Sequence, residues 1–141
     1  MMGLLFGAIA GALMSVQGAM NTRLGEKIGL WETTALVQGI GFLLSVVVAW
    51  IWGKGDVGGI ASVNKFYLLG GVLGVGITFF VMLSMKNLGA AVSVSAILIS
   101  QVLIAAILDA FGFLGMKKVP FGWNKYVGLL VMIGGLILFQ W

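Results

Sequence analysis

The sequence has no cysteine and no histidine, and only 9% of its 141 residues are charged. Without cysteine the chain forms no disulfide, and without histidine it lacks the usual metal ligand and neutral-pH base. A soluble domain carries about 25% charged residues, so a soluble domain is excluded. The common kinds of catalysis therefore lack their residues, and we expect no enzyme and no bound cofactor or metal.

The positive net charge of +4 comes from eight cationic residues that are scattered over short polar segments. Cations dispersed in this way form no patch for nucleic acid, and they are typical of loops at lipid headgroups. The single proline, Pro120, lies in one of these segments, and there is no linker or low-complexity stretch. We expect one integral membrane domain over residues 1–141, with the lipid bilayer as its surroundings and no nucleic-acid partner.

Apolar residues are abundant and make up 61% of the chain. They form five long stretches between short clusters of charge. Each stretch is close to the ~20 residues that a helix needs to cross a hydrocarbon layer of ~30 Å. The pattern predicts an all-α integral membrane protein with five transmembrane helices. The stretches are roughly 3–22, 31–52, 66–86, 90–113 and 123–141.

Aromatic residues support this number of spans independently of hydropathy. All five tryptophans and both tyrosines fall at the expected ends of the spans. A ring in that position has an apolar side in the lipid and a polar edge in water. The residues are Trp31, Trp50, Trp52, Tyr67, Trp123, Tyr126 and Trp141. An odd number of spans places the two termini on opposite sides of the membrane.

The loop charges give only a weak preference for one orientation. Five cations lie on the same side as the N-terminus and three on the other, which favours a cytoplasmic N-terminus by a small margin. A chain that inserts in both orientations needs such a weak bias, and a single topology with few charges is the alternative. The five are Lys54, Lys65, Lys117, Lys118 and Lys125, and the three are Arg23, Lys27 and Lys86.

Glycine is the second excess, with 23 residues. Helices in lipid associate by close packing rather than by hydrophobic burial, so small residues on one face mark a contact surface. In the first stretch they recur at four-residue steps from Gly3 to Ala19. We expect helix packing, within a tight bundle or an oligomer, at Gly7, Gly11, Gly71, Gly74, Gly134 and Gly135.

Four long amides interrupt the apolar stretches. Gln17 and Asn21 lie one turn apart on the same face of the first helix, Gln38 lies in the second, and Gln101 lies close to the middle of the fourth. Polar side chains at this depth are rare unless they line a cavity or bond to another helix. We interpret these four residues as substrate contacts, and bonds that bridge helices are the alternative.

Two of the four carboxylates belong to the apolar stretches. Glu32 opens the second stretch, where a negative charge is favourable at the positive end of a helix dipole. Asp109 follows an apolar run, and an unpaired carboxylate there costs on the order of 1–3 kcal/mol. We expect these two residues to act in ion coupling or in helix positioning.

The chain resembles the YdcZ-like family, a small five-helix branch of the drug/metabolite transporter superfamily. The landmarks that carry the resemblance are Gln17, Asn21, Leu24 and Gly29, then Leu69, Gly70, Gly71 and Gly74, then Leu88, Gly89, Ala90 and Ala91, then Gln101, Asp109, Ala110, Phe111 and Gly112. The resemblance implies a multi-pass exporter of the bacterial inner membrane. Larger superfamily members have ten helices in two inverted repeats, so this chain is similar to one repeat, completed by dimerisation.

Two positions depart from the relatives. Ala110 stands where many family members have a histidine, so no proton-carrying Asp–His pair is available. Gln17 is the strongly polar residue deep in the first helix, where four-helix multidrug transporters have a glutamate. If protons are coupled to transport, Asp109 or Glu32 must carry them.

These features together favour a secondary transporter that works by alternating access. We expect its substrate to be a small neutral, zwitterionic or weakly cationic solute, because so few charges lie deep in the spans. An antiparallel homodimer is the favoured assembly, and a heterodimer with a similar chain is the alternative. Two other functions remain open from the sequence: a small dual-topology ion or water channel, and a non-transporting membrane partner subunit.

Overall fold

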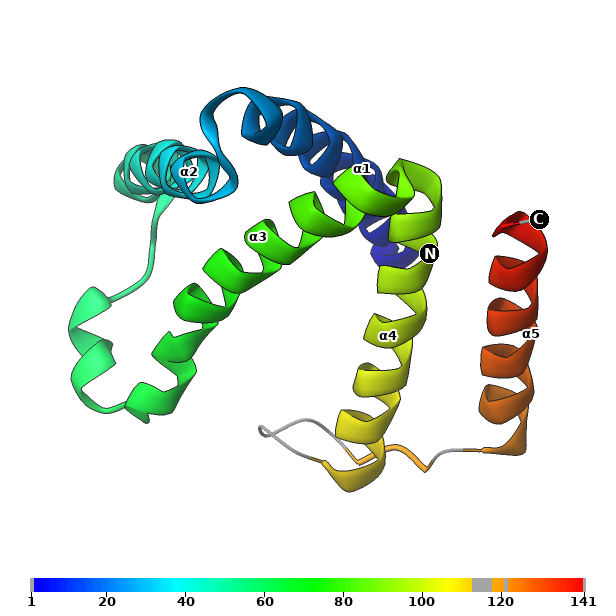
Figure 1. Ribbon diagram of the computed structural model, residues 1–141. Helices are drawn as coiled ribbons and strands as arrows, with labels where there is room; N and C mark the ends of the chain where they lie inside the picture. The colour runs from blue at the N-terminus through cyan, green and yellow to red at the C-terminus, as the bar shows by residue number, and fades with distance from the viewer. Residues whose placement is uncertain (1, 113–117, 121, 141) are drawn as a thin grey trace. The chain divides into compact units, whose positions relative to one another are not determined.

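The computed structural model describes residues 2–112, 118–120 and 122–140. In this part of the chain every regular element is a helix, as the sequence predicts (Figure 1). The long helices are α1 (Met2–Ile28), α2 (Leu30–Trp52), α3 (Leu69–Leu88), α4 (Ala90–Phe111) and α5 (Trp123–Gln140). Two short 3-10 helices, η1 (Val57–Ala61) and η2 (Lys65–Leu68), lie between α2 and α3.

Four helical segments of the described residues are long and apolar enough to cross a membrane: Met2–Ile28, Leu30–Trp52, Lys65–Leu88 and Ala90–Phe111. The apolar part of α5, Trp123–Phe139, is shorter. The 18 residues of α5 extend over about 27 Å. The fifth span therefore stays a prediction, and its expected end at Trp141 and the fourth span's at 113 lie outside the described residues.

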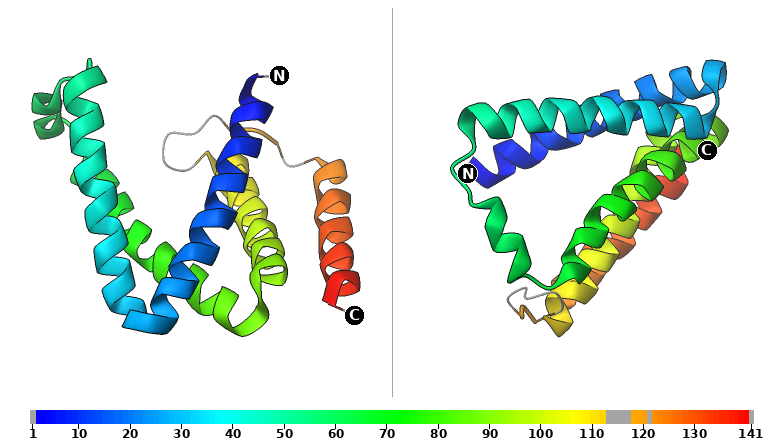
Figure 2. Two further views of the ribbon diagram at one scale, coloured as in Figure 1. Left: turned by 90° about the horizontal axis from the view of Figure 1, so that it is seen from above. Right: turned by 90° about the vertical axis from the view of Figure 1, so that its left-hand side faces the viewer.

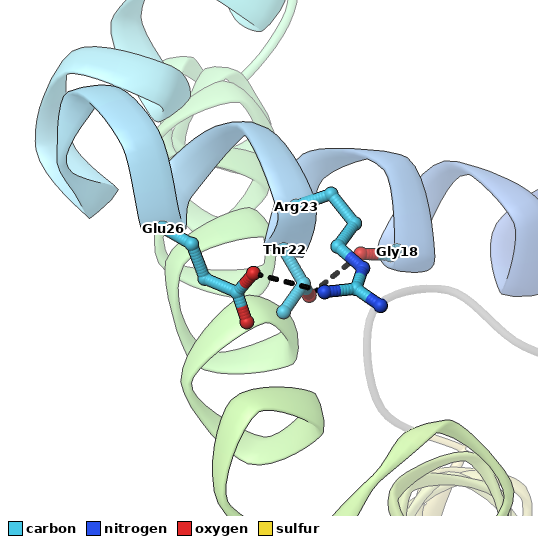
Figure 3. Close-up of polar contacts among 4 residues, drawn as sticks. All are labelled: Gly18, Thr22, Arg23 and Glu26. Atoms are coloured by element: carbon cyan, nitrogen blue, oxygen red, sulfur yellow. Dashed lines mark hydrogen bonds and ion pairs between the residues drawn. The ribbon is translucent and has the colours of Figure 1, made fainter.

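The first helix continues beyond its predicted end at 22 and reaches Ile28. Its last two turns are polar, which suggested a loop, but their side chains bond within the helix (Figure 3). The Thr22 hydroxyl donates to the carbonyl of Gly18 at 2.7 Å, and the Arg23 guanidinium lies 3.3 Å from the Glu26 carboxylate. The polar end of α1 is therefore a helical extension toward the aqueous boundary.

The chain divides into two compact units, Met1–Asn87 and Leu88–Trp141, and each is described here by itself. The first contains α1, α2, η1, η2 and α3, and the second contains α4 and α5. The prediction of a single domain over 1–141 stays a prediction.

Gly29 alone separates α1 from α2 and reverses the direction of the chain. Its φ of 103° and ψ of 153° belong to a region that only glycine adopts readily. The two helices meet at this residue and diverge away from it (Figure 2). A Cβ at Gly29 would also overlap the Glu32 carboxylate. The backbone conformation therefore requires glycine here, and a larger residue would also displace the flexible Glu32 side chain.

Helix α3 packs against the same end of α1 through methionine and glycine. A Cβ at Gly18 would lie 2.7 Å from Cε of Met85, and one at Gly25 would lie 3.5 Å from Sδ of Met82. Met82 and Met85 are the buried hydrophobic side chains of the described residues. Flexible thioethers fill irregular gaps, and the missing side chains of the glycines let the helix backbones approach.

In the second unit, α4 and α5 lie side by side (Figure 1). Helix α4 ends at Phe111 and is capped by Gly112, whose left-handed conformation (φ 67°) directs its N–H to the carbonyl of Leu108 at 2.8 Å. A shallow apolar hollow lies between the two helices and is lined by Leu98, Ile99, Met132, Gly135 and Phe139, among others.

We predict that Gly29→Ala lowers the free energy of unfolding by about 1–3 kcal/mol, because alanine adopts this backbone conformation only with strain. Unfolding of the detergent-solubilised protein, followed by circular dichroism during titration with dodecyl sulfate, measures the change. Gly39→Ala is the matched control, since a Cβ at Gly39 would meet no heavy atom within 4 Å. Equal stability of the two variants would contradict the assignment of the corner to Gly29.

Candidate polar site in the membrane-spanning helices

Gln38 on α2 reaches across to Thr78 on α3. The amide Nε2 of Gln38 donates to Oγ1 of Thr78 at 3.5 Å, the long end for a hydrogen bond. The Thr78 hydroxyl donates in turn to the carbonyl of Gly74, 3.0 Å away and one turn earlier in α3. A Cβ at Gly74 would lie 3.4 Å from the same amide nitrogen, so Gly74 faces Gln38 at van der Waals distance. This polar chain joins α2 to α3 between their apolar surfaces.

Buried polar residues gather where α1, α2 and α3 meet. Asn21 is 8% exposed, and Thr22, Thr33 and Thr34 are buried as well. Thr22 follows Asn21 in α1, and Thr33 and Thr34 lie near the start of α2, on the other side of the corner that Gly29 forms between the two helices. Thr22 and Thr34 donate to carbonyls one turn earlier in their own helices, at 2.7 and 2.8 Å. The Thr33 hydroxyl is buried and has no hydrogen-bond partner among the described residues. This corner therefore keeps unused hydrogen-bonding capacity in an apolar setting.

Two of the predicted amides are exposed. Gln17 lies beside the buried Gly18 but on the outer surface of α1, close to the middle of that helix. Gln101 lies in the middle of α4, in the second unit, and is also exposed. Neither makes a side-chain hydrogen bond in the described part of the chain. The first unit thus places Asn21 in the corner and Gln38 against Thr78, while Gln17 stays outside both groups.

The two carboxylates occupy opposite ends of helices. Glu32 lies in the first turn of α2 and its carboxylate lies over Gly29, where the helix dipole favours a negative charge. Asp109 lies in the last turn of α4, where the dipole disfavours one. Its backbone carbonyl accepts from the N–H of Val119 at 2.9 Å, and its half-buried carboxylate has no partner among the described residues. Asp109 is therefore the less satisfied of the two.

An aromatic stack supplements the polar contact between α2 and α3. The rings of Trp31 and Phe79 lie 4.2 Å apart at 22°, and Phe80 meets Phe79 edge-on at 5.5 Å. Offset aromatic pairs add about 0.5–1.5 kcal/mol beyond the area that they bury. Through this stack Trp31, which the sequence predicts as an interfacial anchor, also holds α2 and α3 together. The Trp31 side chain remains 63% exposed.

The glycines that pack helices in the first unit differ mostly from the predicted set. Gly18 and Gly25 contact α3, and Gly74 faces Gln38. At five predicted positions an added Cβ would meet no other heavy atom of the described structure within 4 Å. They are Gly7, Gly11, Gly71, Gly134 and Gly135. Gly135 lines the hollow between α4 and α5, and the role of all five in helix packing stays a prediction.

Sequence reasoning did not single out Thr78, Gly18 or Gly25. Thr78 lies near the middle of α3, and a polar residue in the middle of an apolar stretch could have been recognised in the sequence as a candidate partner for Gln38. Gly18 and Gly25 are seven residues apart, which places them on one face of α1, but Gly7 and Gly11 have an equally regular spacing. Among the described residues no group of three or more His, Cys, Asp or Glu could hold a metal ion.

Comparison with known proteins finds one family. The family model described as "Putative inner membrane exporter, YdcZ" matches residues 2–138. No curated protein and no solved structure matches the chain.

We predict that Gln38→Leu and Thr78→Val are energetically coupled, by about 0.6 kcal/mol, the typical value for a hydrogen bond between helices in a membrane. A double-mutant cycle on unfolding in mixed detergent and dodecyl sulfate measures the coupling. The control cycle pairs Gln38→Leu with Ser45→Ala, because the Ser45 hydroxyl donates to Gly41 in its own helix at 2.7 Å. Additive effects in both cycles would show that the amide does not bind Thr78.

Proposed function

Because the chain belongs to the YdcZ family of inner membrane exporters, we propose that it is a secondary transporter that exports a small solute by alternating access. The family match covers nearly the whole chain, so the described activity applies to the same residues that form the helices. The protein is a multi-pass inner-membrane protein and a transporter rather than an enzyme.

The observation that carries this proposal is the pair of exposed amides at mid-helix, Gln17 and Gln101. An amide moved from water into hydrocarbon without a partner costs roughly 2–7 kcal/mol. Such residues in spanning helices face the bundle interior or a water-filled cavity rather than lipid. Each amide, in its own unit, is satisfied where water and the solute can reach it.

The chemistry of the polar groups supports a particular class of substrate. Gln17, Asn21, Gln38 and Gln101 both donate and accept hydrogen bonds, and they carry no charge. They suit a neutral, zwitterionic or weakly cationic solute with some apolar surface. Asp109 is our candidate for coupling to an ion, because it lies in the last turn of α4, where the helix dipole disfavours a negative charge. Glu32 is the second candidate.

The open glycine faces support an assembly of two chains. Gly7 and Gly11 lie on one side of α1 with open space around them in the described structure. A ridge of this kind lets a second helix approach closely, and that close approach is the main gain of helix association in lipid. We propose that a second copy, inserted antiparallel, supplies this helix and completes the inverted repeat. A similar chain in a heterodimer is the alternative.

We predict that Gln17→Leu and Gln101→Leu each lower the rate of solute counterflow by roughly tenfold, since each removes a contact worth about 1.4 kcal/mol. Purified protein in liposomes, tested against a panel of amphipathic and amino-acid-like solutes, gives the rates. Ser15→Ala is the control, because its hydroxyl donates to Gly11 in its own helix at 3.0 Å. No counterflow of any solute, or an ion flux of channel size in electrical recordings, would overturn the proposal.

We predict that Gly7→Leu combined with Gly11→Leu abolishes most of the dimer, because the larger side chains keep a second helix away. Chemical cross-linking in liposomes at several protein-to-lipid ratios measures the dimer fraction. Ala8→Leu with Ala12→Leu is the matched control, on the same exposed helix but one residue along.

Accessibility of tags at each terminus separates the possible orientations. Tags reachable from both sides of the membrane support an antiparallel pair. One fixed orientation together with cross-linked dimers would exclude it.

A further inference from the structure

The connection between α2 and α3 has an apolar pattern with a period of three. Large apolar residues occur at Val57, Ile60, Val63 and Phe66. The intervening positions hold small or polar residues only: Gly58, Gly59, Ala61, Ser62, Asn64 and Lys65. An α-helix has 3.6 residues per turn and a strand has two, so neither would gather these four side chains on one side.

The local structure has the matching period within η1, and Val63 lies between η1 and η2. A 3-10 helix has three residues per turn, so residues three apart lie above one another, as Val57 and Ile60 do on η1. The Asp56 carboxylate starts η1 by accepting from the N–H of Gly58 at 2.8 Å. The Asn64 side chain starts η2 by accepting from the N–H of Phe66 at 3.0 Å. Side-chain caps thus enforce the tight helices that the pattern requires.

The four apolar side chains are uncovered in the described structure. Val57 is 84% exposed, Ile60 50%, Val63 49% and Phe66 60%. The lysines of this connection, Lys54 and Lys65, are exposed as well.

The placement of the connection decides what covers these side chains. Residues 53–68 extend from the end of α2 to the start of α3, across the gap between the two diverging helices (Figure 2). Exposed Trp50 and Trp52 precede the connection and exposed Tyr67 lies near its end. Tryptophan and tyrosine at helix ends mark the level of the headgroups. Both ends of the connection are therefore expected at the level of the headgroups.

We propose that residues 53–68 form an in-plane membrane anchor, so that α3 itself, Leu69–Leu88, makes the third crossing rather than all of Lys65–Leu88. Val57, Ile60, Val63 and Phe66 enter the boundary between headgroups and acyl chains, as the apolar face of an interfacial helix does. Lys54 and Lys65 extend toward the lipid phosphates. The anchor holds the far ends of α2 and α3 apart at the surface, while Gln38, Thr78 and the Trp31–Phe79 stack hold the helices together nearer the corner. It does not depend on the proposed transport activity.

The absence of cysteine makes a direct test possible, since a single introduced cysteine is the only thiol in the chain. Ile60→Cys carries a nitrobenzoxadiazole label on the apolar side of η1, and Ala61→Cys carries the same label one residue along as the matched control. Val63→Cys and Ser62→Cys form a second pair. The full-length protein is reconstituted in phosphatidylcholine–phosphatidylglycerol vesicles, with and without lipids brominated near the top of the acyl chain.

The proposal expects blue-shifted emission and several-fold stronger quenching by the brominated lipids at positions 60 and 63 than at 61 and 62. Strong and equal quenching by water-soluble iodide at all four positions would overturn it, because all four labels would then lie in water. Protection of the labels from iodide that increases with the protein-to-lipid ratio would also overturn it, because a second copy of the chain would then cover these positions. Circular dichroism of each labelled variant shows whether the helices are retained.

Discussion

The structure depends on one constraint: helices in a bilayer gain little from burying apolar side chains against each other, so they associate where their backbones can approach closely. In the first unit this happens at one corner. Gly29 reverses the chain, and Gly18 and Gly25 admit the methionines of α3. The small buried apolar core, Met82 and Met85, is what this constraint leads to. Outside the corner α1 and α2 diverge, and their surfaces stay open.

The helices were largely predictable from the sequence because hydropathy records directly which residues can face lipid. The prediction was wrong where a polar segment of the sequence nevertheless forms a regular helix. The polar end of α1 remains helical to Ile28 because Thr22 and Arg23 are satisfied within one or two turns. The packing glycines were harder to predict, since the spacing of Gly7 and Gly11 is as regular as that of Gly18 and Gly25. Regular spacing identifies a face of a helix, but it contains no information about which partner covers that face.

The polar residues divide by the length of their side chains. Ser15, Thr22 and Thr34 each donate to a carbonyl one turn earlier, so a short hydroxyl is satisfied without a second helix. A glutamine has two donors and an acceptor on a long stem and cannot be satisfied in this way. Gln38 therefore reaches Thr78 on another helix, while Gln17 and Gln101 remain exposed. The polarity of Thr78 was visible in the sequence, but its pairing with Gln38 is visible only in three dimensions, and the role of the four amides as substrate contacts stays a prediction.

The first unit has two kinds of open surface, one of small residues on α1 and one of large apolar residues between α2 and α3. The size of the side chains indicates whether protein or lipid covers each surface. The outer half of α1 presents Gly7 and Gly11, where a mobile acyl chain packs poorly against bare backbone but a rigid helix can interlock. The connection from η1 to η2 presents large branched and aromatic side chains flanked by lysine, which a lipid interface covers without any partner. Small-residue surfaces thus favour protein and large-residue surfaces favour lipid. This difference is the reason why we propose a second chain against α1 and the bilayer against the far ends of α2 and α3.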